Sequence, residues 1–167
     1  ATRKTVYDLL NDISYNIPIN QRKYVWKKNN WEELFDDINL IMENSSGDHF
    51  LGSVVLNKIK VDDNIKNHCS IVDGQQRITT LTLLFRAFFE SLKSEGKKDE
   101  FQDDFGKFIW KKIRNKGFVF NEPYLSSQVI TDKDKKVLEY ILIEDIDIEK
   151  LKSFNSNYAK NFIFFHD

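Results

Sequence analysis

The chain has 167 residues, of which 41% are hydrophobic and 31% are charged, and its formal net charge at pH 7 is −1. That size suits one globular domain with a real core, and no apolar run approaches the roughly 20 residues that span a bilayer. A net charge near zero argues against a domain that coats nucleic acid by bulk electrostatics, so any nucleic-acid contact must be local. With Cys69 as the only cysteine and no secretory leader pattern, we expect a cytoplasmic protein without disulfide bonds and without a membrane partner.

The N-terminal part is predicted to alternate helix and extended structure. Residues 5–11 carry apolar side chains at helical spacing, which predicts a short helix. Residues 15–18 alternate apolar and polar side chains and stop at Pro18, which cannot donate to a sheet ladder. Asn30 followed by Glu33 resembles a helix cap, and the apolar stripe behind it predicts an amphipathic helix to about residue 43.

A basic and aromatic stretch lies between these two elements. It interleaves Arg22, Lys23, Lys27 and Lys28 with Tyr24 and Trp26. This mixture suits phosphate contacts and stacking on an exposed base, which makes Tyr24, Trp26 and Lys27 candidate nucleic-acid residues. The alternative is a strand whose two aromatic residues face the core and whose lysines are solvated, because aromatics in period two more often indicate packing than recognition.

The middle of the chain predicts a hairpin followed by a buried helix. Residues 49–56 form a β-branched, apolar strand that continues to 61, and Asp62-Asp63-Asn64 is typical of a turn into a second strand at 65–72. After a tight turn at residues 73–74, a helix begins near Ile78. Its apolar face consists of Ile78, Leu81, Leu84, Phe85, Phe88 and Leu92.

The start of this helix is a candidate anion site, because its first backbone N–H groups lack intrahelical partners and face the positive end of the helix dipole. The residues that stand there are Asp73, Gly74, Gln75, Gln76 and Arg77, with Thr79 and Thr80 one turn on. The amides and hydroxyls can form hydrogen bonds, and Arg77 can fork onto a phosphate or carboxylate. In the alternative interpretation, Asp73 caps the helix, Gly74 makes the turn and Arg77 pairs with a surface acid.

The remainder of the chain predicts helices after a polar connection at 93–98. We expect helices over residues 101–113, from Asp132 through Leu142 and over residues 155–165, with a short extended piece at 118–120. Residues 1–95 thus form a mixed α+β unit and residues 96–167 a helical extension. Because the last apolar helix needs a packing partner, we expect the protein to continue into further domains.

Residues 71–84 have the sequence Ile-Val-Asp-Gly-Gln-Gln-Arg-Ile-Thr-Thr-Leu-Thr-Leu-Leu. This turn sequence closely resembles the DGQQR signature of a bacterial family. That family includes the GmrS part of GmrSD-type modification-dependent restriction enzymes, and its members have a ParB/sulfiredoxin-like fold. The earlier stretch resembles the family pattern Ile-Pro-x-Tyr-Gln-Arg-x-Tyr-x-Trp. The chain keeps Ile17, Pro18, Gln21, Arg22, Tyr24 and Trp26 and departs from the pattern at Asn20.

The resemblance implies a nucleotide-binding, NTP-hydrolysing domain of a DNA-modification-dependent restriction or phage-defence protein. It implies catalytic roles for Asp73, Gln76 and Arg77, and nucleotide contacts for Gln21, Arg22, Gly74, Gln75, Thr79 and Thr80. The ligand is then a nucleoside triphosphate with a divalent cation such as Mg²⁺. DNA and a C-terminal nuclease domain or subunit are further partners that the resemblance implies.

Two alternatives stay open: a DNA- or modified-base-sensing module without turnover, and a regulatory domain with an inactive pocket. The three histidines, His49, His68 and His166, are scattered along the chain, so no HNH-type nuclease site is visible in it. If an anionic ligand binds, Gln21-Arg22 and Gln75-Gln76-Arg77 should converge on one cleft, because an arginine is costly to bury alone.

Overall fold

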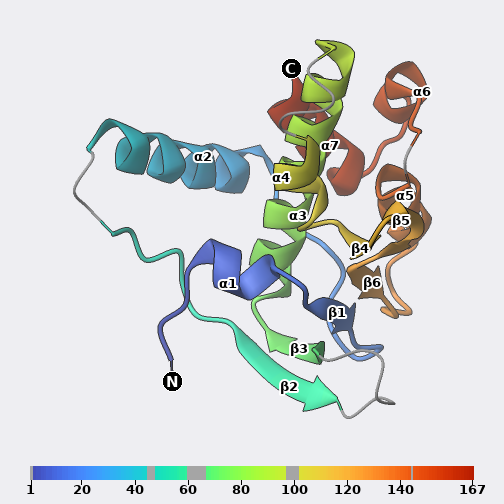
Figure 1. Ribbon diagram of the computed structural model, residues 1–167. Helices are drawn as coiled ribbons and strands as arrows, with labels where there is room; N and C mark the ends of the chain where they lie inside the picture. The colour runs from blue at the N-terminus through green and yellow to red at the C-terminus, as the bar shows by residue number, and fades with distance from the viewer. Residues whose placement is uncertain (1, 45–47, 60–66, 97–101, 144) are drawn as a thin grey trace.

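The computed structural model describes residues 2–44, 48–59, 67–96, 102–143 and 145–167. Its elements are α1 (Val6–Leu10), β1 (Ser14–Ile17), α2 (Lys28–Glu43), β2 (Val55–Ile59), β3 (His68–Asp73), α3 (Gln75–Ser94), α4 (Gln102–Gly106), β4 (Trp110–Ile113), β5 (Gly117–Pro123), β6 (Leu125–Ser127), α5 (Lys135–Ile141), α6 (Ile148–Lys152) and α7 (Asn157–His166). Figure 1 shows α3 rising from the end of β3 through the middle of the molecule. Among the described helices, none is both long enough and apolar enough to cross a membrane.

The main sheet has the strand order β2-β3-β1-β6. β2 is antiparallel to β3, whereas β1 is parallel to both β3 and β6. The sheet is therefore mixed, and the predicted α+β class is confirmed. Because β6 comes from the second predicted segment, the segments 1–95 and 96–167 share this sheet.

The hairpin is shorter than its sequence pattern predicts. Residues 49–54, expected in a strand, have no regular secondary structure, and β2 begins only at Val55. Gly52 interrupts the strand, because its φ of +107° lies in a region that a β-strand does not use. The predicted turn at 62–64 lies outside the described residues.

Helix α3 is the centre of the core. Ile78, Leu81 and Leu84 on its predicted apolar face are all less than 5% exposed. Helix α7 packs along α3 and contributes Phe162, which is fully buried. The helix begins at Gln75, three residues before the expected start, since Gly74 with a φ of +93° already completes the turn.

The predicted helix over 101–113 is wrong. Only the short α4 forms, and β4 then pairs antiparallel with β5. Asn115 and Gly117 adopt positive φ angles of 66° and 81°, which reverse the chain between these strands. The buried Trp110 packs against Phe120 from the opposite strand, with ring centroids 4.9 Å apart. This cross-strand packing outweighs the helical spacing of the phenylalanines that precede it.

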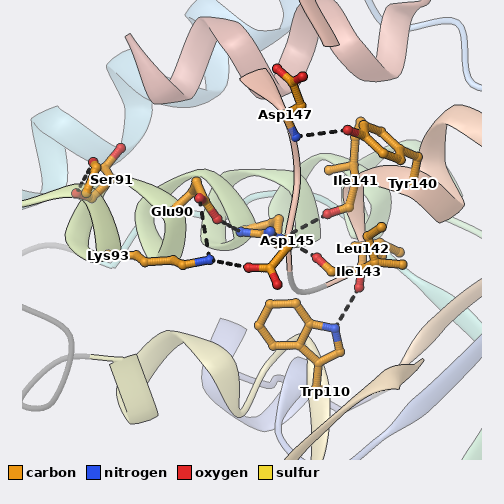
Figure 2. Close-up of polar contacts among 12 residues, drawn as sticks. Glu90, Ser91, Lys93, Trp110, Tyr140, Ile141, Leu142, Ile143, Asp145 and Asp147 are labelled. Carbon is orange, nitrogen blue, oxygen red and sulfur yellow. Dashed lines mark hydrogen bonds and ion pairs between the residues drawn. The ribbon is translucent and has the colours of Figure 1, made fainter. Parts of the chain in front are cut away.

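A polar network fastens the second half of α3 to the chain after α5. The fully buried Arg86 donates from Nε to the Ile141 carbonyl at 2.9 Å and from Nη2 to the Ile143 carbonyl at 3.0 Å. Figure 2 shows the Trp110 indole directed at the Leu142 carbonyl, 2.7 Å away, between these two acceptors in sequence. The last carbonyls of a helix lack intrahelical partners, so these donors cap α5.

Candidate functional site

The turn from β3 into α3 leaves the first amides of α3 without partners inside the helix. Gly74 N–H donates to Asp73 Oδ1 at 2.8 Å, and the first intrahelical bond runs from Ile78 N–H to the Gly74 carbonyl at 3.1 Å. No side chain caps α3. The N–H groups of Gln75, Gln76 and Arg77 precede the first intrahelical bond, and they carry the positive end of the helix dipole.

The Gln75 and Gln76 side chains fasten the 22–26 segment to α3. Gln76 Oε1 accepts from the N–H groups of Val25 and Trp26, at 2.9 and 3.2 Å. Its Nε2 donates to the Lys23 carbonyl at 3.1 Å, and Gln75 Nε2 donates to the Arg22 carbonyl at the same distance. Both glutamines are about 95% buried. In this arrangement they position backbone, and neither amide faces an open space.

The Gln21-Arg22 and Gln75-Gln76-Arg77 motifs lie together, but their arginine side chains have different surroundings. Gln21 Nε2 donates to the Val72 carbonyl at 2.9 Å, which places the first motif beside the end of β3. The exposed Arg22 lines a recess near Ile17 and Ser127 that is too narrow to hold a water molecule. Arg77 lies on the β2 side of the turn. The backbones of the two motifs therefore converge, while the cleft between them is closed.

Arg77 lies against the 52–54 segment. Its Nη1 donates to the Ser53 carbonyl at 3.3 Å, and a Cβ at Gly52 would lie 2.5 Å from the guanidinium carbon. Only glycine leaves room for this approach. Across the described part of the chain, Arg77 has no carboxylate within ion-pair distance, so the expected alternative of a salt bridge to a surface acid is not observed. The hydrogen-bond acceptor that Arg77 has among the described residues is the neutral Ser53 carbonyl.

The same segment covers the turn itself. A Cβ at Gly74 would lie 2.9 Å from Val54 Cγ2 and 3.3 Å from the Ser53 carbonyl oxygen. The turn therefore needs glycine both for its positive φ and for this close contact. The sequence predicted the turn at residues 73–74, whereas the positive φ of Gly52 and the packing of residues 52–54 against this turn were not predicted.

Tyr24 is buried, contrary to its predicted role in nucleic-acid contact. It is 6% exposed, and its ring stacks on Tyr158 with centroids 4.9 Å apart. Its hydroxyl pairs with Thr80 Oγ1 at 2.7 Å and accepts from Trp31 Nε1 at 3.0 Å and Asn161 Nδ2 at 3.1 Å. Burial raises the pKa of the Tyr24 phenol far above its usual value. Tyr24 is a structural hub with no ring face open to a base.

The other candidates divide into exposed and buried groups. Lys27 is exposed, and Trp26 is half-buried against the core. Thr79 and Thr80 are at most 1% exposed, and Thr80 Oγ1 donates to the Gln76 carbonyl at 2.8 Å. The two threonine hydroxyls therefore do not face a ligand in this arrangement. Asp73 is exposed.

Sequence reasoning missed the residues of α7 and the loop before α5 that support Tyr24. Tyr158 donates from its hydroxyl to Asp132 Oδ2 at 2.5 Å. Burial, and to a smaller extent this hydrogen bond, raises the pKa of the Tyr158 phenol above its usual value. Asp132 also accepts from Asp134 N–H at 3.0 Å. No local signal indicates these contacts, because Asn161 and Tyr24 are separated by 137 residues.

No metal centre is recognisable from side chains alone. The described ranges contain no group of three or more histidine, cysteine, aspartate or glutamate residues arranged to hold a metal ion. Asp73 is the one carboxylate of the Asp73–Arg77 motif, and it is exposed.

Comparison with known proteins identifies the family. No match to the chain was found among curated proteins. The family model described as "GmrSD restriction endonuclease, N-terminal domain" matches residues 6–167, which includes every element of the fold. The chain belongs to the family of GmrSD restriction endonuclease N-terminal domains.

Proposed function

We propose that this chain is a nucleotide-binding and NTP-hydrolysing domain of a DNA-modification-dependent restriction protein, and that the β3–α3 turn binds the nucleotide phosphates. The observation that carries the proposal is Arg77. It stands at the third position of an uncapped 20-residue helix and has no acidic partner among the described residues. Helix amides and an arginine whose charge is not neutralised together favour a phosphate group.

The proposed chemistry is phosphoryl transfer to water. This reaction depends on positioning and charge neutralisation more than on covalent catalysis by the protein. The backbone N–H groups of Gln75 and Gln76 would hold phosphate oxygens. Arg77 would neutralise charge that develops during the transfer. A divalent cation bound with the nucleotide would bridge phosphate oxygens, and Asp73 is the residue placed to approach it.

Ligand entry requires the 52–54 segment to move, because Ser53 and Val54 cover the turn. The segment is held to Arg77 by one hydrogen bond of 3.3 Å, and Ser53 is exposed. Although its guanidinium donor is charged, this hydrogen bond is long and exposed to water, so it contributes little net stability, about 1 kcal/mol. A phosphate that replaces the neutral Ser53 carbonyl as the partner of Arg77 would form a stronger contact, because both partners would then be charged and two N–H groups could donate.

The experiment is a phosphate-release assay with each of the four common NTPs and Mg²⁺. Arg77→Ala should abolish release, and Arg77→Lys should restore only part of it, because lysine keeps the charge without the fork. Arg114→Ala, at an exposed arginine after β4, is the matched control and should keep the parent rate. If Arg77→Ala hydrolyses nucleotide at the parent rate, the catalytic role of this turn is refuted.

A further inference from the structure

A groove between α2, α6 and α7 is separate from the β3–α3 turn. Its volume is about 380 Å³, within the usual size of ligand pockets. Three aromatic residues line it, namely Trp31, Phe154 and Phe164, and three lysines do so as well, namely Lys28, Lys152 and Lys160. Of the residues that the structure describes, no acidic one lines the groove. We refer to it as the α2/α6/α7 groove.

The chemistry of the groove favours a ligand that is both flat and anionic. Phe154 and Phe164 are half-buried, and Phe164 lies 6.0 Å from the Trp31 ring, so the floor is largely aromatic. Lys160 Nζ bonds the neutral Asn155 side chain at 2.7 Å, which leaves its charge uncompensated by that contact. Lys28 pairs with Glu32 at 3.4 Å and Lys152 pairs with Glu149 at 3.1 Å, and such exposed pairs are weak.

The charge pattern continues outward from the groove along the 22–28 stretch. Between Asp12 and Glu32 the sequence has no acidic residue and four basic ones, in a chain whose net charge is −1. Arg22, Lys23 and Lys27 are exposed and lead to Lys28 at the start of α2. Successive exposed cations suit the repeated phosphates of a nucleic-acid strand.

We propose that the α2/α6/α7 groove binds one unstacked base of single-stranded DNA, while the lysines on its rim and the 22–28 stretch contact the adjacent phosphates. The buried Tyr24 cannot provide this stacking surface, whereas the aromatic floor of the groove offers one. A base inside a duplex cannot reach the floor, so the ligand is a single-stranded or extruded nucleotide. The inference takes from the proposed function that the protein acts on DNA, and it does not depend on nucleotide hydrolysis.

The first test measures the anisotropy of a fluorescein-labelled oligo-dT octamer on titration with the protein. Lys28→Glu combined with Lys160→Glu should weaken binding at least about tenfold and reduce the slope of log K against log salt by about 1.4, which corresponds to two lost contacts on a single strand. The control combines Lys111→Glu with Lys136→Glu, at two exposed lysines outside the groove, and should change affinity less than about twofold.

The second test separates base stacking from charge. An octamer of the same length without bases should bind the parent protein about tenfold more weakly than oligo-dT, the loss expected for one stacked base. Phe154→Leu removes a ring and keeps an apolar side chain, so it should weaken oligo-dT binding and leave binding of the base-free octamer unchanged.

Equal affinities for oligo-dT of the Lys28→Glu/Lys160→Glu double variant (the rim variant) and its control would overturn the proposal. The groove would then suit an anionic apolar ligand of another class, such as an acidic peptide. Equal discrimination between the two octamers by the parent and Phe154→Leu would also overturn it. NTP hydrolysis by the rim variant should equal that of the parent. Failure of the β3–α3 proposal would therefore be visible separately, as absent hydrolysis with intact DNA binding.

Discussion

Replacing Gln76 by alanine should destabilise the protein more than any other single truncation in the DGQQR motif. The side chain satisfies three backbone groups of the 23–26 segment, the N–H groups of Val25 and Trp26 and the carbonyl of Lys23. Each lost hydrogen bond costs about 1 kcal/mol where water reaches part of the segment, so Gln76→Ala should cost about 3 kcal/mol. Gln75→Ala removes one such bond and should cost about 1 kcal/mol.

The assay is urea denaturation followed by tryptophan fluorescence and by far-UV circular dichroism, with both glutamine variants and the parent measured side by side. Coincident transitions by the two probes would establish two-state behaviour and allow the free energies to be compared. If Gln76→Ala loses no more stability than Gln75→Ala, the three bonds do not hold the segment and the positioning role of Gln76 is wrong.

Three further substitutions test the core that supports the site, each by the same urea denaturation. Leu84→Ala should cost about 2–5 kcal/mol, because this side chain is 2% exposed and its removal leaves a cavity; a loss below 1 kcal/mol would contradict the packing of α3. Tyr24→Phe keeps the ring but leaves the Trp31 and Asn161 donors unsatisfied, so about 2–4 kcal/mol should be lost, and an unchanged midpoint would contradict the hub. Arg86→Met should cost about 3–5 kcal/mol, since the Ile141 and Ile143 carbonyls and the half-buried Glu90 carboxylate lose the Arg86 donors. A neutral effect would show that this network is dispensable.

Local periodicity predicted the parts of the fold in which one face is buried. Ile78, Leu81 and Leu84 recur at helical spacing, and the structure buries all three, because α3 packs against α4 and α7. The same reasoning failed at Trp110, where phenylalanines at helical spacing precede a strand. Cross-strand packing on Phe120 decides that region, and a local pattern does not reveal such contacts.

The candidate site was predictable in location and less so in detail. The Asp73-Gly74 turn and the following helix indicate an anion site from the sequence alone, and the structure gives Arg77 no acidic partner among the described residues. The burial of Tyr24 agrees with the alternative in which its ring faces the core, but the pattern did not decide between that alternative and ligand contact. Its partners Thr80 and Asn161 lie 56 and 137 residues away in the sequence.

The most direct test of the central claim, that the β3–α3 turn binds nucleotide phosphates, is a thermal melt of the protein titrated with NTP and Mg²⁺. Ligand at 100 times its Kd stabilises the folded state by about 2.7 kcal/mol, which for a protein of this size raises Tm by about 5–10 °C. We predict that rise for the parent and for Arg114→Ala, and no rise for Arg77→Ala, whose Tm without nucleotide should stay near that of the parent. An equal rise for Arg77→Ala, or no rise for the parent with any of the four NTPs, would contradict the account.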